Sequence, residues 1–170
     1  MELCLVRHAI AGERGPAWPD DRLRPLTAEG EAKMRLAALG LRALFVPDVI
    51  VSSPLLRAIQ TAEILCEAFK IKGLHISDAL ASGNHEQLFG DVANFRRERV
   101  IAVGHEPFMS GAISFALAGS SDALRLICRK GSAALITFQG SPTAGAGTLE
   151  WLIQPAALRA AGRTVGGGDR

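Results

Sequence analysis

Three short uninterrupted apolar runs constrain the fold of this chain most: Leu3–Val6, Val49–Val51 and Val100–Val103. Runs of this length are typical of strands covered on both faces, because a buried helix would need a longer apolar stretch. Each run is followed by a segment predicted to be helical, at residues 28–44, 55–69 and 107–118. Strands that alternate with helices predict an α/β fold, a three-layer sandwich around a mostly parallel central sheet.

The remaining segments extend this pattern. Further strands are predicted at residues 74–76, 133–138 and 148–153, which gives a sheet of about five to six strands. Another helix is predicted at residues 85–95. Ser53 and Pro54 are expected to start the helix at 55–69, as its N-cap and first residue. The length fits one domain, assigned to residues 1–161, and the glycine-rich residues 162–170 are predicted to be a disordered tail.

Composition narrows the class of protein. The net charge of +2 gives no global field that would favour nucleic acid or a membrane surface. No apolar run approaches the roughly 20 residues of a membrane-spanning helix, and the first residues lack a signal-peptide pattern. Cys4, Cys66 and Cys128 are far apart in apolar stretches, which predicts buried thiols and no metal site. We therefore expect a cytoplasmic protein with no nucleic-acid or membrane partner, and the sequence makes no prediction of oligomeric state.

Charged side chains follow three of the predicted strands. Arg7 and His8 come after the first strand, Arg57 after the second and His105 after the fourth. Ligands of such sheets bind beyond the carboxyl ends of the strands, where these side chains would converge. Two guanidiniums suit the oxygens of a phosphoryl group, and cationic neighbours would keep His8 neutral and nucleophilic. One strand-end histidine is usually structural, but three such ends in a chain with four histidines predict a phosphate site.

The motifs at these positions resemble the histidine phosphatase (phosphoglycerate mutase-like) superfamily, and most of all its small SixA-type phosphohistidine phosphatase branch. The resemblance runs in order from Leu3 to about Arg159, through Leu5–Ala9, Asp21–Thr27, Pro47–Thr61, Val103–Pro107, Lys130–Ser132 and Trp151–Pro155. It implies a phosphoglycerate mutase-like fold and a phosphatase that uses neither metal nor cofactor.

The resemblance also implies roles for individual residues. His8 would be the nucleophile, and Arg7, Arg57 and His105 would form the phosphate pocket. Arg24 is either a further phosphate-binding residue or a solvated loop charge, with equal weight. Lys130 is expected to be an exposed strand-end lysine.

Two departures from the family pattern bear on mechanism. Ala9 stands where much of the wider superfamily has glycine. The superfamily also carries a carboxylic acid after the third strand, where Asp78, His85 and Glu86 are the candidates here. Glu106, beside His105, is a further candidate general acid. Glu86 is equally well explained as a first-turn carboxylate that stabilises its own helix.

The predicted function is the hydrolysis of phosphohistidine on a protein substrate through a phospho-His8 intermediate. About 25 residues separate the third and fourth strands, too few for a large lid, and an open pocket suits phosphate displayed on a protein. One alternative is a small-molecule phosphomonoesterase on the same scaffold, which would need contacts from the loop at 81–86. The other is a non-catalytic phosphate-binding module. A mutase is disfavoured because it must enclose and reorient its substrate.

Overall fold

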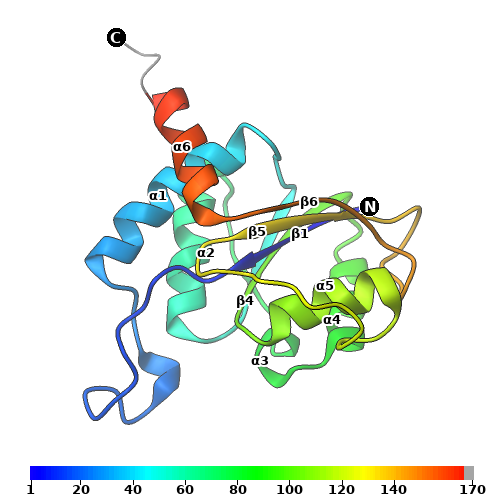
Figure 1. Cartoon of the computed structure of the whole chain (residues 1–170), viewed down its shortest axis with the longest axis horizontal. Helices are drawn as coiled ribbons and strands as arrows, with labels where there is room; N and C mark the ends of the chain where they lie inside the picture. The colour runs from blue at the N-terminus through cyan, green and yellow to red at the C-terminus, as the bar shows by residue number, and fades with distance from the viewer. Residues whose placement is uncertain (167–170) are drawn as a thin grey trace.

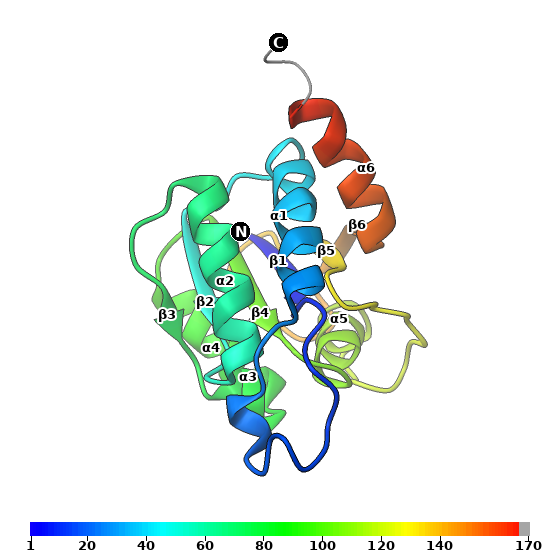
Figure 2. The same cartoon turned by 90° about the vertical axis from the view of Figure 1, so that its left-hand side faces the viewer.

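The computed structural model describes residues 1–166 and has a six-stranded sheet between two layers of helices (Figures 1 and 2). The strands are β1 Glu2–Arg7, β2 Val49–Ser52, β3 His75–Ile76, β4 Arg99–Gly104, β5 Ala133–Thr137 and β6 Thr148–Ile153. The α-helices are α1 Ala28–Arg42, α2 Leu56–Phe69, α3 Ala79–Ser82, α4 His85–Asn94, α5 Phe108–Ala118 and α6 Pro155–Gly166. A short 3₁₀ helix, η1, spans Asp21–Leu23. No helix within the described residues is long and apolar enough to cross a bilayer.

The sheet has the strand order β3-β2-β4-β1-β5-β6. The first four strands in this order pair in parallel, and β5 runs antiparallel to both β1 and β6. The prediction of an α/β sandwich with a mostly parallel sheet is therefore confirmed. The consequence for function is that β1, β2 and β4 all end at the same edge.

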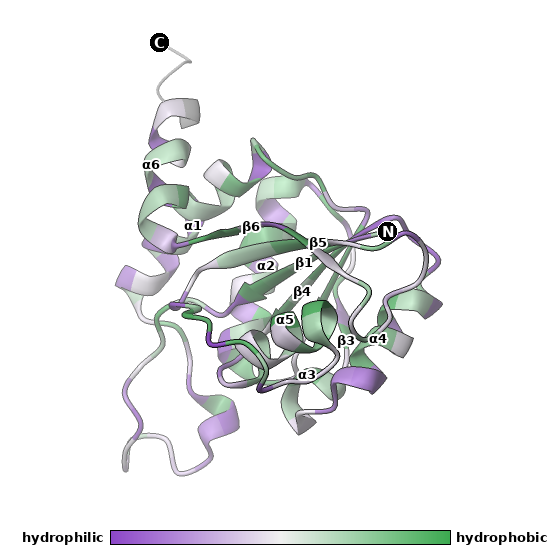
Figure 3. Ribbon diagram, turned by 45° about the vertical axis from the view of Figure 1, so that its right-hand side comes forward, coloured by the Kyte–Doolittle hydropathy of each residue, from purple (hydrophilic) through white to green (hydrophobic). Residues whose placement is uncertain are grey.

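Alternation along the strands explains their continuous apolar runs. In β1, Leu3 and Leu5 face one core, together with residues of α3, α4 and α5. Cys4 and Val6 face the other core, together with residues of α1, α2 and α6. Because successive strand residues point to opposite faces, a strand covered on both faces must be apolar at every position. Figure 3 shows hydrophobic residues along the central strands of the sheet.

The start of α2 differs from the prediction. Leu55 is the N-cap and makes no side-chain capping bond, so Ser53 and Pro54 precede the helix. The Ser53 hydroxyl accepts a hydrogen bond from the Leu55 N–H (3.3 Å) and also contacts His105. Ser53 is thus bound to a neighbouring strand end instead of capping the helix.

The C-terminal segment also differs from the prediction. Helix α6, which the sequence analysis did not predict, continues to Gly166. The predicted disordered tail at 162–170 is therefore wrong for residues 162–166, and residues 167–170 lie outside the described residues. Gly40 and Gly162 explain the difference, because a β-carbon at either position would overlap with a backbone carbonyl of the facing helix. Gly162, one of the glycines that suggested disorder, thus allows α6 to pack backbone to backbone against α1 at Gly40.

Candidate active site

His8 lies directly after β1 and is held by its own backbone. Its N–H donates to the Gly104 carbonyl (2.9 Å), and its side chain is buried. The imidazole Nδ1 lies 2.7 Å from the Ala9 carbonyl oxygen. Because a carbonyl can only accept, Nδ1 carries the proton and Nε2 keeps its lone pair. The free nucleophilic atom of His8 is therefore Nε2.

The environment of His8 keeps the ring neutral. Burial, as the largest cause, and the proximity of His105, Arg57 and Arg7 together lower the pKa of His8 to about 3, against the opposing hydrogen bond to the Ala9 carbonyl. The two guanidiniums disfavour an imidazolium because it would carry the same charge. At neutral pH the side chain is an uncharged imidazole in a positively charged surrounding, which is the form required of a nucleophile.

His105 faces His8 from the end of β4. The two ring centroids are 5.0 Å apart, and the ring planes are inclined by 50°. The Nε2 atom of His105 lies 2.7 Å from the hydroxyl oxygen of buried Ser53. That hydroxyl accepts from the Leu55 N–H and still has one proton to donate and one lone pair with which to accept, so either tautomer of His105 satisfies the contact. The other ring nitrogen, Nδ1, is buried and has no partner within residues 1–166.

Two arginines, Arg7 and Arg57, lie in the same cavity as His8 and His105. Arg7 Nη1 donates to the Cys128 carbonyl (2.7 Å), and Arg57 Nη1 donates to the Asp21 carbonyl (2.8 Å). The Nε groups of both arginines are buried and unpartnered among the described residues. Buried polar groups are normally satisfied, so these two N–H groups, joined by His105 Nδ1 in the tautomer that protonates it, suit the oxygens of an anion.

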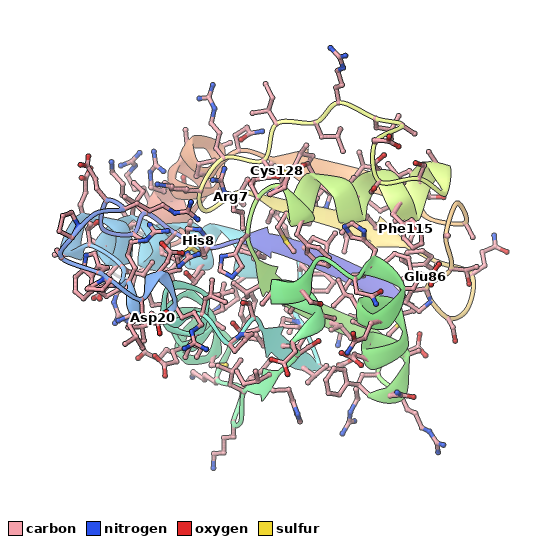
Figure 4. All side chains as sticks on the ribbon, turned by 90° about the horizontal axis from the view of Figure 1, so that it is seen from below. Arg7, His8, Asp20, Glu86, Phe115 and Cys128 are labelled. Atoms are coloured by element: carbon pink, nitrogen blue, oxygen red, sulfur yellow. The ribbon has the colours of Figure 1, made fainter. Side chains whose placement is uncertain are left out.

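A cavity of about 380 Å³, here called the His8 cavity, brings these residues together. Arg7, His8, Arg57 and His105 all line it. Three further cationic side chains also line it: Arg14, Arg24 and Lys130. Figure 4 shows Arg7 and His8 side by side near the loop that carries Asp20. The cavity is therefore rich in positive charge around the neutral imidazoles of His8 and His105.

Arg24 and Lys130 both line the His8 cavity but differ in burial. Arg24 is buried, with its Nε donating to the Asp21 carboxylate (2.8 Å) and its Nη1 to the Gly12 carbonyl (2.8 Å). It is therefore not a solvated loop charge, although a role in phosphate binding stays a prediction. Lys130 is exposed as expected, yet it lines the cavity. Partial burial and the nearby Arg7, Arg24 and Arg57 lower the pKa of its ammonium.

A second cavity of about 450 Å³, here called the His85 cavity, adjoins the first. The two cavities share Arg14, Arg57, His105 and Glu106. The remaining wall is largely apolar and includes Leu55, Leu80, Pro107 and Phe108. The His85 ring stacks on Phe108, with centroids 4.3 Å apart and planes inclined by 7°. Any group bound beside Arg57 and His105 thus has a neighbouring compartment into which it can extend.

Comparison with known proteins matches residues 3–94 to the sequence profile of the histidine phosphatase superfamily (branch 1). The match covers more than half of the chain and includes His8 and Arg57.

The chain belongs to the histidine phosphatase superfamily.

Solved structures share the fold of this chain, and one curated relative is similar to part of its sequence. The protein histidine phosphatase SixA bound to tungstate has a TM-score of 0.80 and 23% identity, covering 93% of this chain and 99% of that one. The alpha-ribazole phosphatase of Shigella flexneri has a TM-score of 0.68 and 17% identity, covering 91% and 97%. An uncharacterized protein of Picosynechococcus is 48% identical over 69 residues, which are 40% of this chain and 41% of that protein. The chain thus spans about two fifths of the length of the curated relative it matches.

The candidate general acids are placed differently in this histidine phosphatase. Glu106 lines both cavities; its Oε2 accepts from the Ser110 hydroxyl (2.7 Å), and its Oε1 is buried without a partner in the described part of the chain. Glu86 lines a third cavity instead, and Figure 4 shows it well away from His8. Asp78 is exposed, and His85 lines only the second and third cavities. Glu106 is the candidate acid that borders His8.

Sequence reasoning assigned no role to Asp21 and a capping role to Ser53. Asp21 pairs with Arg14, Arg24 and Arg57. Ser53 fixes the ring of His105. The signal for Asp21 was its position in the loop motif before Arg24, but which arginines it meets depends on how that loop folds.

Proposed function

We propose that this histidine phosphatase hydrolyses phosphohistidine on a protein substrate by way of a phospho-His8 intermediate. The observation that carries the proposal is the neutral His8 imidazole with its free Nε2, which lines a cavity together with the unpartnered buried nitrogens of Arg7, Arg57 and His105. Family membership and fold support phosphatase activity. The identity of the leaving group is inferred from the site.

The proposed reaction has two displacements at phosphorus. In the first, His8 Nε2 forms a bond to phosphorus while the substrate P–N bond breaks, and the departing imidazole keeps the electron pair and takes up a proton. In the second, water attacks the phosphorus of phospho-His8, the P–Nε2 bond breaks, and inorganic phosphate leaves. Arg7, Arg57 and the Nδ1–H of His105 would stabilise the negative charge on the equatorial oxygens in both steps.

Two features favour a phosphohistidine substrate. The first is the leaving group: an imidazole is protonated near neutral pH and needs less acid catalysis than an alkoxide. Of the acids that the sequence analysis named as candidates, Glu106 lines the His8 cavity, where Glu13 is the other lining carboxylate. The second is access, because α3 and α4 pack against the sheet through buried Leu80, Leu88 and Phe89. Residues of α3 and the start of α4 therefore line the side of the His85 cavity, and we infer that no lid formed by residues 1–166 covers the site against a protein substrate.

A small-molecule phosphomonoesterase is the second candidate function. Ala81, Ser82, Gly83 and His85 line the His85 cavity beside Arg57. These are contacts that a sugar or nucleotide phosphate would need. The alpha-ribazole phosphatase among the structural neighbours shows that the fold also occurs in a small-molecule phosphatase.

The deciding experiment compares kcat/KM for a phosphohistidine peptide, a sugar phosphate and an aryl phosphate in one buffer. We expect the phosphohistidine peptide to be preferred over the sugar phosphate by at least about tenfold, because only the ester needs a strong acid. Equal values would support the phosphomonoesterase. Binding of orthovanadate without turnover of any substrate would support the non-catalytic module. Rapid quench of the wild type should yield an acid-labile, base-stable phosphoenzyme that His8→Ala lacks.

The proposed location and partner of the protein follow from the proposed phosphohistidine substrate. A phosphatase for protein phosphohistidine would act on phosphorylated signalling proteins, and we place it in the cytoplasm with a phosphorylated protein as its partner.

A further inference from the structure

The two cavities differ in their balance of charge. The His8 cavity is lined by five cationic side chains and two carboxylates, Glu13 and Glu106. The His85 cavity is lined by two cationic side chains, Arg14 and Arg57, and two carboxylates, Asp21 and Glu106. Asp21 lines only the second of these cavities. The structure therefore has a strongly basic compartment next to one in which the charges balance.

Asp21 is held firmly at this position. Its Oδ1 accepts from Arg24 Nε (2.8 Å) and from Arg14 Nε (3.2 Å), and its Oδ2 pairs with Arg57 Nη2 (3.1 Å). Its backbone carbonyl accepts from Arg57 Nη1 as well (2.8 Å). The hydrogen bond from Arg24 holds the pKa of this carboxyl below its usual range, followed in effect by the charges of Arg57, Arg24 and Arg14. A fixed carboxylate thus borders the His85 cavity at neutral pH.

The geometry of phosphoryl transfer indicates what the Asp21 carboxylate would contact in a bound substrate. The attacking and leaving atoms lie roughly in line on opposite sides of phosphorus. With His8 Nε2 on one side, the leaving group must extend away from His8. The His85 cavity adjoins the phosphate-binding donors of Arg57 and His105 and does not include His8. The His85 cavity, with Asp21 on its wall, is thus the adjoining space into which a leaving group can extend away from His8.

We propose that Asp21 is a specificity-determining residue that selects substrates by the charge of the leaving group. Its carboxylate disfavours leaving groups that bear a carboxylate or a second phosphate, and it favours neutral or cationic ones such as a histidine ring. This inference rests on the proposed function, because it takes the His85 cavity as the compartment that receives the leaving group. Coulomb's law for unit charges several ångströms apart at a partly exposed site gives selectivity of about three- to tenfold.

Aryl phosphates that differ in charge provide the test. The probes are phenyl phosphate, 4-carboxyphenyl phosphate and 4-(trimethylammonio)phenyl phosphate, assayed with the wild type, Asp21→Asn and Asp20→Asn. Asp20 is the matched control because it lies on the same loop, pairs with Arg22 (2.9 Å) and lines neither cavity. The readout is the ratio of kcat/KM between probes on one enzyme sample, which cancels any difference in the fraction of active protein.

We expect Asp21→Asn to raise the ratio of the anionic probe to phenyl phosphate by about three- to tenfold and to lower that of the cationic probe similarly. Asp20→Asn should leave both ratios within about twofold of the wild type, because its charge lies outside the cavities. A uniform loss on all three probes, including complete loss, would overturn the proposal and assign Asp21 to holding the loop. These ratios are independent of whether the wild type prefers phosphohistidine to sugar phosphates, so failure of the proposed function would be seen separately.

Discussion

The His8 cavity and the His85 cavity share a wall but are built from different parts of the fold. The first is formed around residues at the ends of β1 and β4 and at the start of α2, and its key side chains, His8 and Arg57, are buried. The second is formed by α3, by the segment between α3 and α4, and by the start of α5. The two cavities therefore suggest a division of roles. The edge of the sheet holds the groups proposed to react with phosphate, and the surrounding segments shape the space for the rest of the substrate. The following predictions test that division.

The largest effect is expected from removing the nucleophile. His8→Ala should lower turnover on the order of ten-thousandfold or more for every substrate, because no other free imidazole nitrogen is aimed at the same phosphate. The measurement is kcat with an aryl phosphate, with thermal unfolding as a check on the fold. His75→Ala is the control, since His75 lies in the exposed edge strand β3 and should leave turnover close to that of the wild type. Comparable losses in both variants would contradict the assignment of His8.

The next largest effect concerns the shared wall. Arg57→Ala should reduce kcat by about a hundredfold or more, because it removes a preorganised cation from the transition state. Arg22→Ala is the matched variant: Arg22 is an exposed arginine that pairs with Asp20 and lines neither cavity. It should change kcat by less than about twofold. If the two variants behaved alike, the catalytic effect of Arg57 would be no more than a general contribution of positive charge.

Glu106 lines both cavities, so we expect its replacement to affect ester substrates more than phosphohistidine. Glu106→Gln should lower kcat/KM for a sugar phosphate by about a hundredfold, because an alkoxide must be protonated as it leaves. The same variant should cost less than about tenfold on a phosphohistidine peptide, whose imidazole is readily protonated. Glu86→Gln, in the separate third cavity, should alter neither value. Equal losses on both substrates would show that Glu106 does not act as the acid for ester substrates.

The smallest effect concerns the stability of the His8 cavity against acid. Burial lowers the folded-state pKa of His8 to about 3 and that of His105 to about 4, both from 6.5. Below pH 6.5 the unfolded chain therefore binds protons that the folded chain does not. The free energy of unfolding should fall as the pH drops from 6.5 to 5, by up to about 1.4 kcal/mol per pH unit for each histidine.

Urea unfolding at several pH values measures this dependence. Because glutamine does not titrate, His105→Gln should have a shallower slope between pH 6.5 and 5 than the wild type, and the slopes should agree above pH 7. Identical slopes throughout would show that His105 already carries a proton in the folded protein.

The residues at the strand ends were the predictable part of the site, for a physical reason. Arg7, His8 and His105 adjoin strands whose apolar runs are unmistakable, and parallel strands must end at the same edge. Asp21 was not assigned a role because its contact with Arg57 joins residues 36 positions apart across an irregular loop. Ser53 was misassigned because serine before a proline is an ordinary helix-start signal. Its actual partner, His105, is brought to it by the pairing of β2 with β4.

The fold was predicted in outline for the same reason, and the errors lie where packing overrides local preference. Glycine is a poor helix former, so a segment with Gly162 and Gly166–Gly168 favoured a disordered tail. Gly162 favours the folded helix only because it packs against α1, whose residues lie more than a hundred positions earlier in the chain. No local pattern contains that information.

The close contact of α1 with α6 has a consequence for how sequence variation in this protein should be interpreted. Gly40 and Gly162 each cost about 1 kcal/mol of helix propensity relative to alanine, yet even alanine cannot be accommodated where the two backbones meet. Both positions should therefore be as intolerant of substitution as His8, although they lie in a helix pair that holds the scaffold together. An alignment in which these glycines never change would record the spacing of two helices, and mistaking them for binding residues would misdirect mutagenesis.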